Sequence, residues 1–131
     1  GDTLGLIYPH GDFVQPNLPP PDFNKEILFN TLDDLKKLEL NYLALSHFGI
    51  HDNPYHLIDN AKESIENWLN FVKNLDSLST YEASIEVISW LKSNYEALGI
   101  DSETIDNYIN NAHFDMQING IRNYIKKKKN P

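Results

Sequence analysis

The sequence predicts an α/β fold that continues into a group of helices, and three observations lead to this fold class. Residues 4–8 and 42–45 are short apolar runs with the length and composition of buried strands. A helical pattern lies between them, with its apolar residues on one side. After residue 53, apolar side chains recur at spacings of three and four almost to the end of the chain, which indicates amphipathic helices.

The segment between the two predicted strands contains a proline-rich loop and a helix. Residues 12–22 hold four prolines, and because proline fixes φ and has no N–H donor, we expect an extended loop there. The helix begins after Asn24, a residue type that caps helix N-termini well. Strand, loop, helix and strand in this order are typical of a β-α-β unit. Because an isolated pair of strands is marginal in water, the prediction requires further strands from outside this sequence.

The chain divides into a sheet portion, residues 1–52, and an extension of three helices, residues 53–131. The expected helix boundaries are Asn53-Pro54, a capping box from Ser79 to Glu82, Gly99 and Ser102, with a weak point at Gly120. We expect the apolar stripes, which include Ile85, Leu98 and Met116, to face the core. The alternative is that they form a groove that binds a partner.

Composition restricts the classes of function. The 131 residues carry a formal net charge of −8, so the chain repels phosphate backbones and we expect no nucleic-acid binding. No apolar run reaches the length of a membrane span, and we expect no membrane insertion. The absence of cysteine excludes disulfides and thiol catalysis, and agrees with a cytoplasmic location. The basic cluster Lys126–Lys129 suits a helix C-terminus, with an anionic surface contact as the alternative.

Several short segments of the sequence resemble motifs of the metallo-β-lactamase-fold hydrolases. Gly1-Asp2-Thr3-Leu4 is similar to the Gly-Asp motif after which these enzymes enter the second half of their sheet structure. Ser46-His47-Phe48-Gly49 resembles the last histidine motif of one branch of the superfamily. The segment 18–23 looks like the proline-rich stretch that this branch places before a helix, and 52–54 looks like its continuation into C-terminal helices. The resemblance covers about residues 1–75.

The resemblance implies the C-terminal half of a four-layer αββα sandwich over residues 1–52, with the helical extension appended. It implies that Asp2 bridges two divalent metal ions and that His47 completes the second metal site, with zinc expected and iron or manganese as alternatives. A metal-bound hydroxide would attack the carbonyl of a small ester, thioester or lactone substrate. No catalytic residue is assignable beyond these ligands, and Tyr8 and His10 are candidate substrate contacts.

The sequence lacks the histidine-rich signature that supplies most metal ligands in that superfamily. The implied hydrolase therefore requires the N-terminal half of the fold, in the same chain or in another chain; otherwise the chain is a degenerate relative. The alternative function is a non-catalytic helical interaction module, or a subunit, on a partial α/β fold. This alternative predicts an apolar surface that stays open in the monomer, and self-association into a homodimer.

Overall fold

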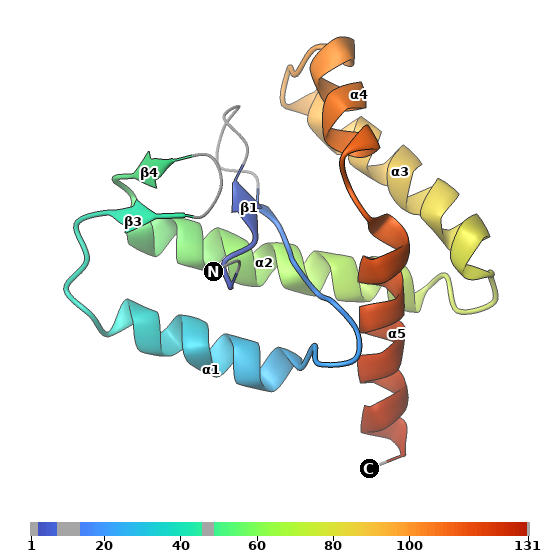
Figure 1. Cartoon of the computed structure of the whole chain (residues 1–131), viewed down its shortest axis with the longest axis horizontal. Helices are drawn as coiled ribbons and strands as arrows, with labels where there is room; N and C mark the ends of the chain where they lie inside the picture. Colours follow the sequence, from blue (N-terminus) through green and yellow to red (C-terminus); the bar gives the residue numbers. More distant parts are fainter. Residues whose placement is uncertain (1–2, 8–13, 46–48, 131) are drawn as a thin grey trace.

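The computed structural model describes residues 3–7, 14–45 and 49–130. These residues form five α-helices and two small antiparallel hairpins (Figure 1). The helices are α1 (Lys25–Lys36), α2 (Pro54–Lys73), α3 (Thr80–Ala97), α4 (Ser102–Asn110) and α5 (Phe114–Lys129). The strands are β1 (Leu6–Ile7), β2 (Val14–Gln15), β3 (Leu43–Ala44) and β4 (Ile50–His51).

The predicted αββα sandwich is wrong for the part of the chain that the structure describes. The two predicted strands exist as β1 and β3, but β1 pairs antiparallel with β2, and β3 pairs antiparallel with β4. Each strand thus pairs with the strand next to it in the sequence, and the two hairpins form separate sheets. With two residues per strand, neither sheet is large enough to support a layer of helices, although β2 packs against α2. The apolar stripes of the helices are buried largely against each other instead.

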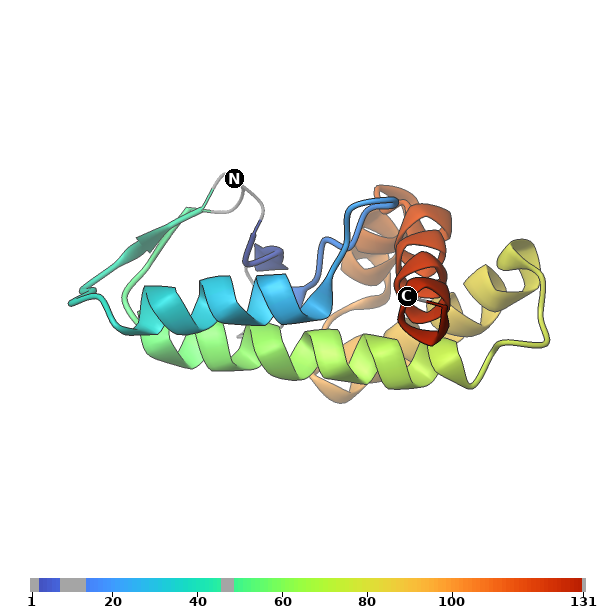
Figure 2. The same ribbon diagram turned by 90° about the horizontal axis from the view of Figure 1, so that it is seen from below.

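Helix α2 lies at the centre of the fold and contacts α1, α3, α5 and β2. Figures 1 and 2 both show α1 running alongside α2. Trp68 of α2 is 1% exposed, with its ring edge-on to Trp90 of α3 and stacked on Phe114 of α5. The buried residues of α2 are Pro54, Leu57, Ile58, Ala61, Ile65, Trp68, Leu69 and Val72.

Several predicted helix boundaries are confirmed by their hydrogen bonds. The Asn24 side chain accepts from the Ile27 N–H at 3.0 Å, and both bonds of the capping box between Ser79 and Glu82 are formed. Pro54 is the first residue of α2. Gly99 adopts φ +78° after α3, and the N–H that follows it, from Ile100, reaches back to the Tyr95 carbonyl. This is the Schellman arrangement, which favours glycine because of the positive φ.

The third predicted helix is two helices, because the chain breaks its helical course between α4 and α5. Its N-cap is Asp101, which accepts from the Thr104 N–H at 3.0 Å, in place of the expected Ser102. The expected inward faces are also partly wrong. Ile85 and Leu98 of α3 and Met116 of α5 are exposed.

Gly120 allows the proline-rich segment to cross α5 at close range. It is buried within the helix, and a Cβ at this position would overlap the Leu18 carbonyl oxygen and crowd the Pro19 backbone. The Leu18 N–H donates to Gln117 Oε1, one turn earlier in α5, at 2.6 Å. The glycine therefore permits a backbone contact between distant segments, and the helix continues through it.

The N-terminus of α1 is tied to the C-terminal turn of α5 through Glu26. Lys128 Nζ and the Tyr124 hydroxyl both donate to Glu26 Oε1 at 2.6 Å. The bond from Lys128, followed by the bond from Tyr124, lowers the pKa of the Glu26 carboxyl from its ordinary 4.5 to about 2. The tether therefore depends on an ionised carboxylate.

We predict that Gly120→Ala destabilises the protein, although alanine normally favours a helix over glycine by about 1 kcal/mol. The added methyl group displaces the Leu18 carbonyl, at a cost of about 1 to 3 kcal/mol for overpacking. Thermal unfolding measured by circular dichroism tests this. Asn123→Ala in the same helix, whose side chain forms no hydrogen bond or ion pair in the described chain, is the control and should keep or slightly raise the melting temperature, because alanine favours a helix over asparagine. A rise for Gly120→Ala would contradict the close approach.

We predict that Glu26→Gln weakens the dependence of stability on acid pH. The folded pKa lies below the unfolded one, so this carboxylate stabilises the fold above about pH 4.5 and loses its contribution as the pH falls towards 2. Because its side chain is half exposed, solvent screening limits the contribution to about 1 kcal/mol or less. Urea titrations at several pH values measure the slope. The exposed Glu103→Gln should keep the wild-type slope; an unchanged slope in Glu26→Gln would refute the tether.

Candidate functional site

The residues that the resemblance singled out lie outside the described residues. Asp2 and His47, the expected metal ligands, and Tyr8 and His10, the expected substrate contacts, all belong to this group. The structure therefore does not bring them together or separate them, and the dinuclear metal site stays a prediction.

Within residues 3–7, 14–45 and 49–130, no group of three or more histidine, aspartate or glutamate side chains could hold a metal ion. Of the described histidines, His51 lies on β4, His56 in the first turn of α2 and His113 at the start of α5. In the same part of the chain, no helix combines the length and the apolar character needed to cross a membrane.

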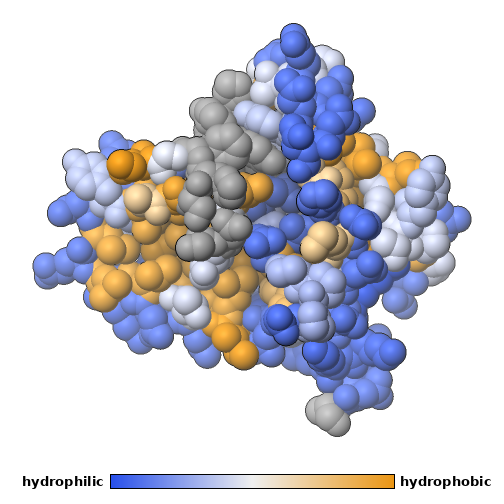
Figure 3. Space-filling view, viewed as in Figure 1, coloured by the Kyte–Doolittle hydropathy of each residue, from blue (hydrophilic) through white to orange (hydrophobic). Residues whose placement is uncertain are grey.

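An apolar surface lies where α1 ends, α2 begins and the β3–β4 hairpin projects. We call it the hairpin surface and define it by Leu38, Tyr42, Ile50 and Tyr55, whose side chains are 53%, 66%, 73% and 40% exposed. On the face shown in Figure 3, apolar side chains also gather between α1 and the hairpin. Half-buried leucines that pack against the core from this region are Leu28, Leu35, Leu40, Leu43 and Leu45.

Local hydrogen bonds hold the hairpin surface in place. The Tyr55 hydroxyl donates to the Leu38 carbonyl at 2.7 Å and accepts from the Leu40 N–H at 3.0 Å, which links the start of α2 to the end of α1. In the hairpin, Ala44 pairs with Ile50, and both are exposed. Leu43, on the opposite face of the strand, packs against the core. The hairpin thus buries one face and presents the other.

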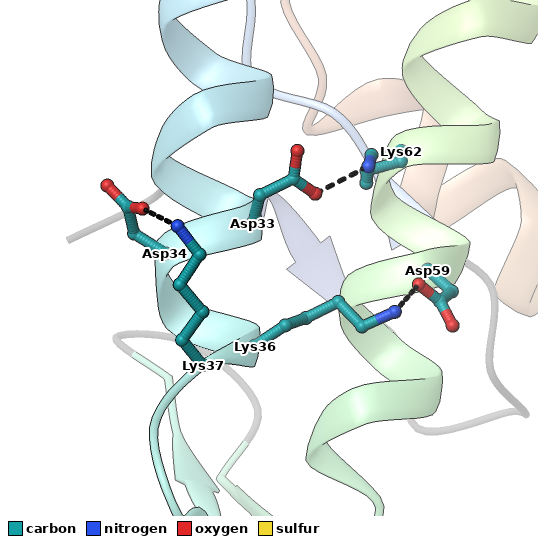
Figure 4. A network of polar contacts seen from close by, with 6 residues as sticks. All are labelled: Asp33, Asp34, Lys36, Lys37, Asp59 and Lys62. Atoms are coloured by element: carbon teal, nitrogen blue, oxygen red, sulfur yellow. Dashed lines mark hydrogen bonds and ion pairs between the residues drawn. The ribbon is translucent and has the colours of Figure 1, made fainter.

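Ion pairs between α1 and α2 flank this region (Figure 4). Lys62 donates to Asp33 at 2.6 Å, and Lys36 donates to Asp59 at 2.7 Å, so both pairs cross from one helix to the other. Lys62 is the main cause of a lowered pKa at the Asp33 carboxyl. Lys37 and Asp34 form a further pair within α1. Three carboxylates and three ammonium groups make up this network, and their formal charges cancel.

The prediction from the sequence was wrong for the region of the hairpin surface. Residues 42–45 were expected to form a strand buried in a larger sheet. The available signal was Gly49, which adopts φ +93° just before β4. A glycine between two short apolar runs is typical of a hairpin, so Ile50 and His51 could have been recognised as the second strand.

In comparisons with known proteins, the chain matches no family model, no curated protein and no solved structure.

Proposed function

We propose that this chain is a non-catalytic helical interaction module that self-associates through the hairpin surface. The observation that carries the proposal is the exposure of Leu38, Tyr42, Ile50 and Tyr55 in one region of the fold. Removing apolar surface from water is worth about 25 cal/mol per Å². Contiguous exposed apolar surface on a monomer is typical of a contact site.

A second copy of the chain is the occupant that the charges favour. Two molecules with a net charge of −8 repel each other over most of their surfaces. The ion-pair network beside the hairpin surface has no net charge, and it contains both signs. A two-fold contact places the same patch on both subunits, so a rim with both signs can complement itself.

The strands add a backbone component to this proposal. In the described chain β3 and β4 each have a single neighbouring strand, so each leaves an edge whose N–H and C=O groups face outward. Two-stranded hairpins are marginal alone and gain stability from additional strands. Strand addition across the two-fold axis would supply such a strand.

Metal-dependent hydrolysis, the other function that the sequence suggested, remains a prediction from motif resemblance. Its implied ligands Asp2 and His47 lie outside the described residues, and the sandwich on which it depended is not formed by the described ones. No feature of the described residues favours it over the interaction module.

We predict that the wild-type protein elutes as a dimer, at twice the monomer mass of 15.1 kDa, in size-exclusion chromatography with light scattering. The double variant Tyr42→Ser, Ile50→Ser should shift the equilibrium towards monomer by about tenfold or more, since it removes two exposed apolar side chains. The runs include a metal chelator in one series and zinc in another, and the dimer should persist in both.

The matched control is Tyr81→Ser, Ile85→Ser, which removes two exposed apolar side chains of α3. It should leave the dimer intact. A monomeric wild-type protein at all concentrations would contradict self-association. Equal weakening by both double variants would contradict the hairpin surface as its location.

A further inference from the structure

An open cavity of about 520 Å³ lies between the C-terminal parts of α2 and α5, and it is rich in cationic side chains. Lys73 comes from α2, while Arg122, Lys126 and Lys129 come from α5. The other lining residues are Val72, Asp76, Ile125 and Asn130. The cavity therefore contains four cations and one carboxylate, in a chain whose overall charge is −8.

The lysines of this cavity differ from all other lysines of the described chain. Each of the others forms an ion pair with a carboxylate or donates to a backbone carbonyl: Lys25, Lys36, Lys37, Lys62, Lys92, Lys127 and Lys128. Lys73, Lys126 and Lys129 have no such partner among the described residues. The cations that lack a protein partner thus line one and the same cavity.

Arg122 is the fixed cation of the cavity wall. Its Nη2 donates to the Leu75 and Leu78 carbonyls at 2.9 and 2.7 Å, in the loop between α2 and α3. Both acceptors are neutral, so the guanidinium keeps its full charge. Its Nε is buried and has no hydrogen-bond partner. Arg122 therefore contributes a positive charge that forms no ion pair with a carboxylate of the described residues.

The negative end of the helix dipole favours lysine in the last turn of each helix. It does not require the ends of two helices to open onto one cavity, nor does it require the lysines there to lack acidic partners. Val72 and Ile125 give the cavity an apolar part, which reduces the screening of charge by water. These features together form a site for a small anion with more than one negative charge.

We infer that this cavity binds a phosphate-type oxyanion, either a free pyrophosphate or phosphate ester or the phosphomonoester headgroup of a lipid. Phosphate oxygens accept charge-assisted hydrogen bonds from the lysine ammonium groups, which are the unpartnered donors here. The inference is independent of self-association, because the hairpin surface is built from other residues.

The test is isothermal titration of the full chain with pyrophosphate at low ionic strength. The triple variant Lys73→Gln, Lys126→Gln, Lys129→Gln should weaken binding by about tenfold or more, since it removes the three unpartnered charges. It should still fold, because these side chains form no hydrogen bond or ion pair in the described chain. Circular dichroism checks this. The matched control, Lys36→Gln, Lys37→Gln, Lys92→Gln, removes the same charge elsewhere and should change affinity less than about twofold.

Co-sedimentation with phosphatidylcholine vesicles that contain phosphatidic acid distinguishes the source of the oxyanion. Binding to both pyrophosphate and these vesicles supports a lipid headgroup, and binding to pyrophosphate alone supports a free ligand. Equal weakening in both triple variants would overturn the inference, since it would reflect net charge alone. Undetectable pyrophosphate binding by the wild-type protein would also overturn it, as would tighter binding to a single-stranded oligonucleotide than to pyrophosphate.

Discussion

The burial of α2 by its neighbours is the interaction on which the rest of this fold depends. The helix packs against α1, α3, α5 and β2, so its apolar side chains are covered from several directions. Trp68 shows the consequence, because its ring meets rings from both α3 and α5. Short hairpins of two residues per strand could not supply this burial. A core organised around one helix therefore replaces the sheet.

The way α1 covers α2 leaves the hairpin surface open. Ion pairs join the two helices along one edge, through Lys62 with Asp33 and Lys36 with Asp59, and they balance charge there. Between the end of α1 and the start of α2, the chain forms the β3–β4 hairpin. This hairpin buries one face against the core and exposes the other. An apolar surface beside an ion-pair network with both signs of charge is suited to contact with an identical molecule. At the opposite end of α2, the unpartnered lysines give a different chemistry, suited to anions.

Local chemistry was predictable from the sequence, and long-range pairing was not. Asn24, the Ser79 capping box, Pro54 and Gly99 fix helix ends through neighbouring residues, and the structure confirms them. Two apolar runs around a helix, however, fit a β-α-β unit as well as two separate hairpins. The distinction depends on β2, which is too short to stand out in the sequence, and on β4, for which Gly49 is the only local signal.

The roles of single residues also depend on long-range contacts that the sequence does not reveal. Gly120 was expected to weaken a helix, but its role comes from Leu18, 102 positions earlier, whose carbonyl lies against it. On α3, Ile85 was expected to face the core but is exposed, whereas Val87 is buried. The cationic cavity combines Lys73 with Lys126 and Lys129, which only the packing of α2 and α5 brings together. The expected metal ligands Asp2 and His47 stay outside this comparison.

We propose the hairpin surface as the contact between copies of this chain. A dilution series of two-dimensional nitrogen–proton NMR spectra tests it most directly, because each backbone amide reports separately. Self-association through the hairpin surface predicts concentration-dependent shifts in residues 38–44 and 50–55, with the amides of α3 unaffected. Spectra that do not change with concentration, or shifts centred on α3 and α4, would contradict it.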